Sequence, residues 1–338
     1  MLGPSLFGSG RSWGMLGAGL LAWGGLADPV IATQEAIDQP TDTTEIAELW
    51  DKVSPWLELA LPWILLAISV FVLYTFIKGR QHRLHNTPRR PQTFTPEMGV
   101  LLFFGMYLMG VIAAGAAKKL FGLDQMTAGE LMADPSAQVK LQGGFYLGQL
   151  LLLVVFLNLR RKPRRMGHDS RTSWFGAMLF GIGTLVLVWP ICMSSGNVAA
   201  WAIRFVWGVE ADPISHDLLN VFISSEKDVW FWSLVGCATL LPGIFEEIMY
   251  RGFLQESLSR LGINPWYSIG ATSVLFALMH IGSVEPHALV SLFVLSLGFG
   301  WAYEKTGRLA APITMHILFN VGNIALSMWL YGGEAAAS

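Results

Sequence analysis

The sequence has few charged residues and almost no cysteine. Only 14% of its 338 residues are charged, whereas a soluble domain carries about 25%. Lysine and arginine number 22 against 24 acidic residues, so no basic excess exists to neutralise the phosphates of a nucleic acid. Cys192 and Cys237 both lie in apolar runs and make neither a disulfide framework nor a zinc knuckle. These absences disfavour a soluble enzyme, a nucleic-acid binder and a disulfide-stabilised domain.

Apolar residues are abundant instead. They make up 53% of the chain, and the mean hydropathy is +0.49. The 14 tryptophans and 20 phenylalanines suit a protein with aromatic anchors at the membrane interface. The composition therefore predicts an all-α fold, a polytopic bundle of transmembrane helices in a lipid bilayer.

The N-terminal 55 residues divide into two segments. Residues 1–27 place Arg11 before a short apolar stretch and end at Ala27 in a small-x-small pattern, which is typical of a signal peptide. The alternative is an uncleaved first helix. Residues 28–55 carry seven acids and one lysine, which predicts a polar extracytoplasmic segment.

Eight further segments have the length and apolar character of membrane spans, which need about 20 residues each. They cover residues 56–77, 97–117, 143–159, 174–193, 229–251, 266–282, 287–303 and 312–331. Fifteen basic residues fall on one side of this arrangement and six on the other. The positive-inside rule then places the 78–96 loop in the cytoplasm and the C-terminus outside, and the protein is expected in a bacterial cytoplasmic (inner) membrane.

Ionisable residues inside these spans are concentrated after residue 229. We therefore expect N-terminal transmembrane helices and loops over 56–228 and a core that carries the chemistry over 229–331. A charged group in the middle of a span costs at least ~2.5–3.5 kcal/mol, so it requires a partner or a function. Three clusters qualify, and they cover residues 245–251, 276–280 and 312–320.

Helical spacing gives the two glutamates of the first cluster different roles. Glu247 and Arg251 are four residues apart with the acid first, which is the favourable order for an ion pair. Glu246 has no basic residue three or four positions later, so it is the unpaired carboxylate and the candidate general base.

The second and third clusters add two histidines. If residues 229–260 form one helix and 266–282 returns beside it, Glu246 and His280 lie at equal depth and face each other. His316 and Asn320 share one helix face, with Pro312 near the helix start. They could donate hydrogen bonds to an oxyanion, or His316 could bind a metal.

The three clusters together resemble the CPBP family, the group of CAAX proteases and bacteriocin-processing enzymes that is also called Abi. The family pattern is Glu-Glu-x-x-x-Arg, then Phe-x-x-x-His, then His-x-x-x-Asn or Asp. It is matched here by Glu246, Glu247, Arg251, Phe276, His280, His316 and Asn320. The resemblance covers residues 229–325, and the earlier spans carry no signal of this family.

The resemblance implies an intramembrane endopeptidase that acts on a membrane-associated peptide, which can be prenylated or carry a leader. It assigns water activation to Glu246 and His280, oxyanion stabilisation to His316 and Asn320, and a supporting role to Glu247 and Arg251. Glu246, His280 and His316 could instead supply three ligands to zinc. The chain has no His-Glu-x-x-His motif, which favours the metal-free chemistry slightly.

Two other functions remain open at this point. A proton-coupled transporter also places glutamate and histidine inside the membrane, but it would need ionisable groups across the whole thickness, and the first four spans have almost none. A catalytically inactive binding or immunity factor would keep the same fold without needing Glu246.

Overall fold

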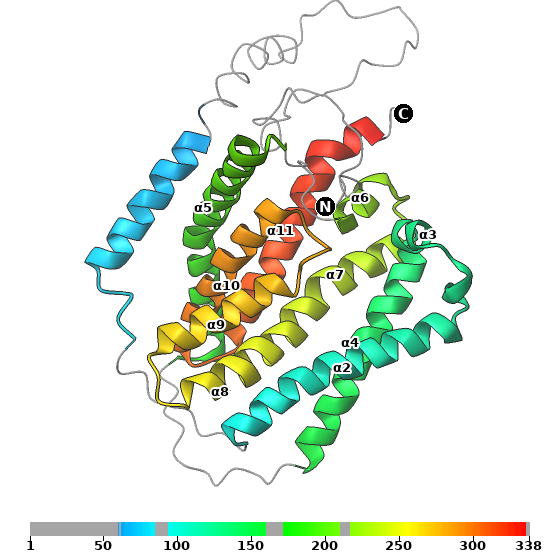
Figure 1. Ribbon diagram of the computed structural model, residues 1–338, viewed down its shortest axis with the longest axis horizontal. Helices are drawn as coiled ribbons and strands as arrows, with labels where there is room; N and C mark the ends of the chain where they lie inside the picture. Colours follow the sequence, from blue (N-terminus) through cyan, green and yellow to red (C-terminus); the bar gives the residue numbers. More distant parts are fainter. Residues whose placement is uncertain (1–59, 61, 85–93, 160–171, 210–216, 336–338) are drawn as a thin grey trace, which may run out of the picture.

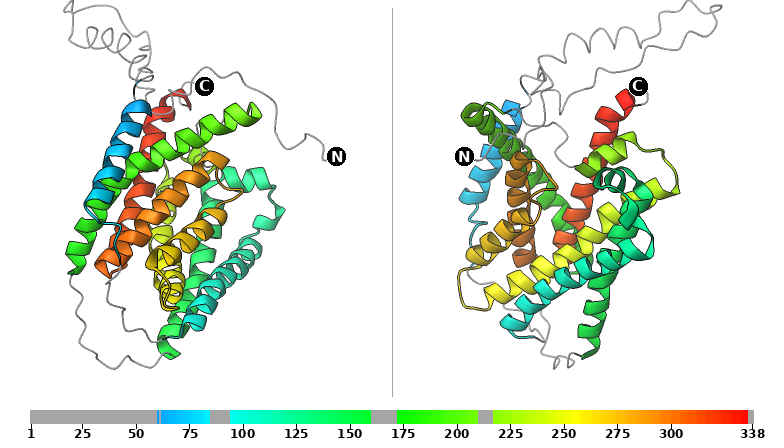
Figure 2. Two further views of the ribbon diagram at one scale, coloured as in Figure 1. Left: turned by 60° about the vertical axis from the view of Figure 1, so that its left-hand side comes forward. Right: turned by 45° about the vertical axis from the view of Figure 1, so that its right-hand side comes forward.

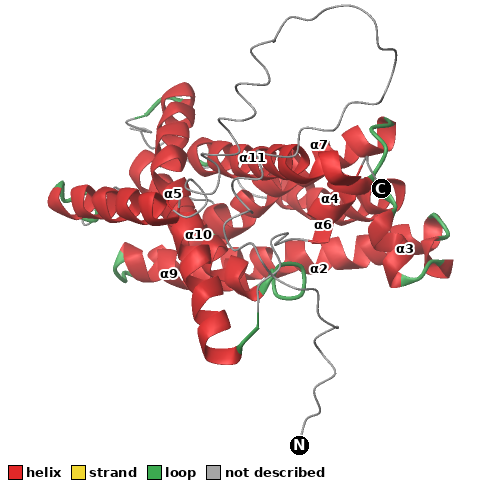
Figure 3. Ribbon diagram, turned by 90° about the horizontal axis from the view of Figure 1, so that it is seen from above, coloured by secondary structure: helices red, strands yellow, loops and turns green. Residues whose placement is uncertain are grey.

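The computed structural model describes the chain over residues 60, 62–84, 94–159, 172–209 and 217–335. The expected signal segment and the acidic segment after it lie outside the described residues, as do many of the basic residues that oriented the chain. Within the described ranges every regular element is helical, as Figure 3 shows, and the one extended contact is an isolated bridge between Ile281 and Val284. The all-α prediction is confirmed.

An apolar helix at Pro62–Lys78 precedes the labelled elements of Figure 1. The labelled elements are α2 (Pro96–Leu120), η2 (Leu123–Gln125), α3 (Ala128–Ala133), α4 (Pro135–Leu159), α5 (Trp174–Trp207), α6 (Asp217–Ser224), α7 (Val229–Glu247), η3 (Ile248–Gln255), α8 (Glu256–Ser259), α9 (Pro265–Leu278), α10 (Pro286–Thr306) and α11 (Ala310–Ala335).

Six helices of the described chain are long and apolar enough to cross a membrane. They are α2, α4, α5, the continuous helix Val229–Ser259, α10 and the Ala310–Trp329 part of α11. The other two expected spans correspond to shorter helices, Pro62–Lys78 and the 14-residue α9. The protein is therefore an integral membrane helix bundle, and the number of eight spans stays a prediction.

Helix α5 is longer than the sequence pattern predicted. It runs through Pro190 to Trp207, and α6 follows, so the expected end of this span at residue 193 was wrong. Proline is tolerated inside membrane helices because neighbouring groups can satisfy the freed backbone carbonyl. The helix ends at Gly208, whose left-handed φ of 65° suits glycine.

Helix α9 is shorter than the expected 266–282 span. Asn264 caps its start and Pro265 is its first residue, but it ends at Leu278. Fourteen residues rise only ~21 Å, which is less than the ~30 Å hydrocarbon core. A turn through Gly282, with φ of 90°, follows, so His280 lies in a turn rather than late in a helix.

The core is organised around one long rod made of α7, η3 and α8. Helices α2 and α4 form an antiparallel pair that packs on one side of this rod, α4 against α7 and α2 against η3 and α8. Helices α9, α10 and α11 pack on the other side, and α5 covers α10 and α11 (Figures 1 and 2). The site described below lies in the middle of this rod.

The crossing of α2 and α4 depends on a glycine. A Cβ atom on Gly148 would lie 2.3 Å from the carbonyl oxygen of Met109 and 2.7 Å from the Ala113 Cβ. Small residues allow this close approach of backbones in membrane bundles. In contrast, a Cβ on Gly143 of the same helix would meet nothing within 4 Å.

We therefore predict that Gly148→Ala lowers the free energy of unfolding by about 1–3 kcal/mol, the usual cost of overpacking. The matched control Gly143→Ala should leave it unchanged or raise it by up to about 1 kcal/mol, because alanine is the better helix former. Unfolding in detergent, followed by circular dichroism, measures both. Equal losses in the two variants would contradict the packing described here.

Candidate active site

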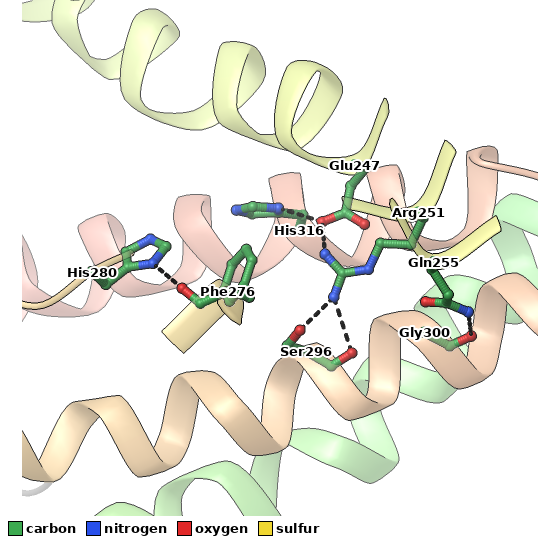
Figure 4. Close-up of polar contacts among 8 residues, drawn as sticks. All are labelled: Glu247, Arg251, Gln255, Phe276, His280, Ser296, Gly300 and His316. Atoms are coloured by element: carbon green, nitrogen blue, oxygen red, sulfur yellow. Dashed lines mark hydrogen bonds and ion pairs between the residues drawn. The ribbon is translucent and has the colours of Figure 1, made fainter. Parts of the chain in front are cut away.

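One buried carboxylate receives hydrogen bonds from two helices. Oε1 of Glu247 lies 3.0 Å from Nη1 of Arg251 and 2.8 Å from Nδ1 of His316. The Glu247 and Arg251 side chains are fully buried, and His316 is 4% exposed. Figure 4 shows this arrangement. The predicted ion pair is confirmed, and His316 is an additional partner that the spacing within one helix could not reveal.

Arg251 extends the contact to α10. Its Nη2 donates to the carbonyl oxygen of Ser296 at 3.0 Å and contacts the Ser296 hydroxyl at 2.6 Å. Arg251 belongs to η3, an eight-residue π-helical stretch that directly follows the two glutamates. Wider π turns inside α-helices occur frequently at functional sites. The two contacts with Ser296 connect the rod to α10 at the depth of the site.

The same face of the rod continues as a buried polar stripe. Gln255 donates through Nε2 to the carbonyl oxygen of Gly300 at 3.2 Å and to Glu304 at 3.1 Å, and Ser259 lies 3.5 Å from Glu304. The polar positions Glu247, Arg251, Gln255 and Ser259 recur every four residues. That spacing within an apolar helix was the signal for Gln255, which the sequence reasoning missed together with its partner Glu304 on α10.

Aromatic rings hold the imidazole of His316 in place. It stacks on Phe299 with ring centroids 5.1 Å apart, and Phe276 meets it edge-on at 5.9 Å. Phe276 is 1% exposed and also contacts the ring of His280 at 4.8 Å. Phe276 is therefore a packing residue, and its ring lies between the two histidines, as Figure 4 shows.

His280 is fixed by its own turn. Its Nδ1 lies 2.8 Å from the carbonyl oxygen of Phe276, and its carbonyl oxygen accepts a hydrogen bond from the Ser283 hydroxyl at 3.0 Å. A carbonyl oxygen only accepts, so Nδ1 of His280 must carry a proton. In the neutral imidazole, Nε2 then holds a lone pair and can accept a proton or a hydrogen bond.

Glu246 differs from Glu247 in making no hydrogen bond to the described residues. The Oε2 atoms of both glutamates are enclosed and without a donor, but Oε1 of Glu247 is held by Arg251 and His316. A carboxylate with no donor at all is costly, which favours a function for Glu246 over a structural role. No hydrogen bond joins Glu246 to His280 among the described residues, and their expected approach stays a prediction.

Asn320 is partly buried on α11, one turn after His316. Its Nδ2 donates to the carbonyl oxygen of Ala238 on α7 at 3.2 Å. One of its two N–H groups is therefore already used, and the other remains available for an oxyanion.

The proposed zinc ligands do not form a metal site in the described part of the chain. No group of three His, Cys, Asp or Glu side chains there could hold a metal ion. Glu246, His280 and His316 thus do not fit a common ion, and we derive no step through a metal.

Fold and site together define an integral membrane protein with an acid–histidine site inside its helix bundle. Residues 228–322 match the model of the family described as type II CAAX prenyl endopeptidase Rce1-like, which confirms the resemblance seen in the sequence. A Bacillus subtilis (strain 168) protein named "Uncharacterized protein YyaK" is 25% identical over 258 residues, 69% of this chain and 78% of its own length. No solved structure matches the chain. The family match supports a protease role.

The buried ion pair gives a stability prediction. Arg251→Met leaves the Glu247 charge buried with His316 alone, so it should lower the free energy of unfolding by about 3–5 kcal/mol. Arg260→Met is the comparison, because Arg260 pairs with Glu256 at the same spacing but is itself 20% exposed, and it should cost clearly less than Arg251→Met, since water reaches the guanidinium side of the pair. Denaturant unfolding in detergent compares the two.

Adding Glu247→Gln to Arg251→Met removes the uncompensated charge and should restore part of the loss. If the two arginine variants were equally stable, or if the second substitution restored nothing, the ion pair would not be the buried, coupled interaction described here.

Proposed function

We propose that this protein is an intramembrane endopeptidase that hydrolyses a peptide bond of a membrane-associated substrate. The observation that supports this most is the contrast between two adjacent glutamates. Oε1 of Glu247 is held by Arg251 and His316, whereas Glu246 makes no hydrogen bond to the described residues. A site that neutralises one carboxylate and leaves the next unpaired provides a base.

Glu246 acts as the general base. A water molecule gives a proton to its carboxylate while the water oxygen forms a bond to the peptide carbonyl carbon, and the carbonyl electron pair moves to oxygen. When this oxyanion collapses, the C–N bond breaks, and the proton passes from Glu246 to the leaving amine. Nε2 of His280 accepts the second water proton in a hydrogen bond and so orients the attack.

His316 and Asn320 stabilise the oxyanion. With Nδ1 of His316 donating to Glu247, a protonated imidazole presents Nε2–H to the developing negative charge. Preorganised donors of this kind typically contribute 10²–10³-fold each to the rate.

The position of the site indicates the substrate class. Glu246 and Glu247 lie ~27 Å from the start of the 31-residue helix Val229–Ser259 and ~19 Å from its end, at 1.5 Å per residue. This depth suits a peptide that the membrane itself holds, such as a prenylated C-terminal segment or a leader-bearing precursor. The family model is described by CAAX prenyl endopeptidase activity, and we propose the bacterial cytoplasmic membrane as the location.

The proposal predicts that Glu246→Gln separates activity from stability. Cleavage of a quenched-fluorescent hydrophobic peptide library by purified protein in mild detergent should fall at least 10²-fold, the usual contribution of a general base. The melting temperature should stay the same or rise, because the variant removes a partly buried carboxylate that makes no hydrogen bond to the described residues. Glu247→Gln should instead lower both the cleavage rate and the melting temperature.

Glu226→Gln, in the turn between α6 and α7, serves as the control and should match wild type. Equal cleavage by wild type and Glu246→Gln would remove Glu246 from the chemistry. If wild-type protein cleaved neither the library nor a prenylated CAAX-type peptide, the inactive binding role would replace the peptidase.

A further inference from the structure

Helix α7 carries a proline one turn before the two glutamates. Pro242 has no backbone N–H, so the carbonyl oxygen of Ala238 loses the helical donor that it would normally receive from position 242. In a membrane there is no water to replace such a bond, and an unsatisfied carbonyl costs several kcal/mol. The sequence thus creates an acceptor on α7 that another helix has to satisfy.

Asn320 of α11 satisfies this acceptor. Its Nδ2 donates to the Ala238 carbonyl oxygen at 3.2 Å. Only the NH₂ end of the side-chain amide can donate to a carbonyl, so the contact also fixes which end of the amide points to α7. The second N–H of Asn320 and its Oδ1 make no hydrogen bond to the described residues, and their direction follows from the planar amide.

Gly243, which follows Pro242 on α7, lets α11 come close enough for the hydrogen bond between Asn320 and Ala238. A Cβ on Gly243 would lie 2.5 Å from Cγ1 of Ile317. Three contacts therefore follow one another along the two antiparallel helices: His316 with Glu247, Ile317 with Gly243, and Asn320 with Ala238.

We propose that Pro242 is a positioning residue, which frees the Ala238 carbonyl so that this oxygen orients the Asn320 amide toward the reacting carbonyl. The inference rests on the function proposed above, because it assigns to Pro242 the alignment of one oxyanion donor. It also explains why a helix-weakening residue stands one turn before the catalytic glutamate. The second donor, His316, is aligned separately by Glu247.

Pro242→Ala tests this directly. The new backbone N–H at position 242 can donate to the Ala238 carbonyl, which releases the Asn320 amide. We expect kcat to fall at least tenfold on the cleaved library peptide with KM unchanged, because oxyanion donors act in the transition state. The melting temperature should stay the same or rise, since alanine is the better helix former, whereas a merely structural proline would lower it.

A double-mutant cycle shows whether Pro242 acts through Asn320. Asn320→Ala should lower kcat by itself, and adding Pro242→Ala should then cause no further loss. Pro190→Ala is the matched control, because Pro190 is also a proline inside a membrane helix, and it should keep the wild-type kcat.

Wild-type kcat in Pro242→Ala, or additive losses in the double variant, would overturn the role of Pro242 while Glu246→Gln remained inactive. Wild-type cleavage by Asn320→Ala would overturn it as well. Wild-type cleavage by Glu246→Gln would instead show that the proposed function fails, so the two failures are distinguishable.

Discussion

The structure depends on one buried carboxylate that accepts hydrogen bonds from two side chains in the interior of the helix bundle. Glu247 is fully buried and accepts hydrogen bonds from Arg251 and His316. A buried charge in an apolar medium is tolerated only if it is paired and hydrogen-bonded, so the three side chains have to meet. Through Arg251 and Ser296 the same cluster includes α10, and through His316 it includes α11. The need to pair the buried charge of Glu247 therefore aligns the rod, α10 and α11 with one another at one depth.

This requirement also explains how stability and chemistry are divided between neighbouring residues. Adjacent helical positions point about 100° apart, so Glu246 cannot share the partners of Glu247. The carboxylate of Glu246, which makes no hydrogen bond to the described residues, is unfavourable for folding, and the ion pair of Glu247 with Arg251 beside it offsets that cost. Proteins commonly keep such destabilising groups where function needs them. The aromatic rings of Phe276 and Phe299 complete the arrangement, because they hold His316 without adding another polar group.

Local spacing predicted the parts of the site that lie within one helix. The ion pair of Glu247 and Arg251 follows from their four-residue separation, and the shared helix face of His316 and Asn320 follows from the same spacing. The contact of His316 with Glu247 joins residues 69 positions apart, and the bond of Asn320 to Ala238 joins residues 82 apart. Both contacts depend on how α11 crosses α7, and the spacing of residues within a single helix does not predict such a crossing. The end of α9 at Leu278 and the continuation of α5 to Trp207 were likewise set by a turn and by tertiary contacts rather than by hydropathy.

The central claim, that Glu247 holds His316 through Nδ1, can be tested most directly by ¹⁵N NMR of histidine-labelled protein, with the His316 signals assigned from a His316→Gln sample. The shared carboxylate predicts that Nδ1 of His316 carries a strongly hydrogen-bonded proton, and that this proton signal shifts in Glu247→Gln but not in Glu246→Gln. A His316 ring protonated only at Nε2, or a spectrum insensitive to Glu247→Gln, would contradict the arrangement on which the site is built.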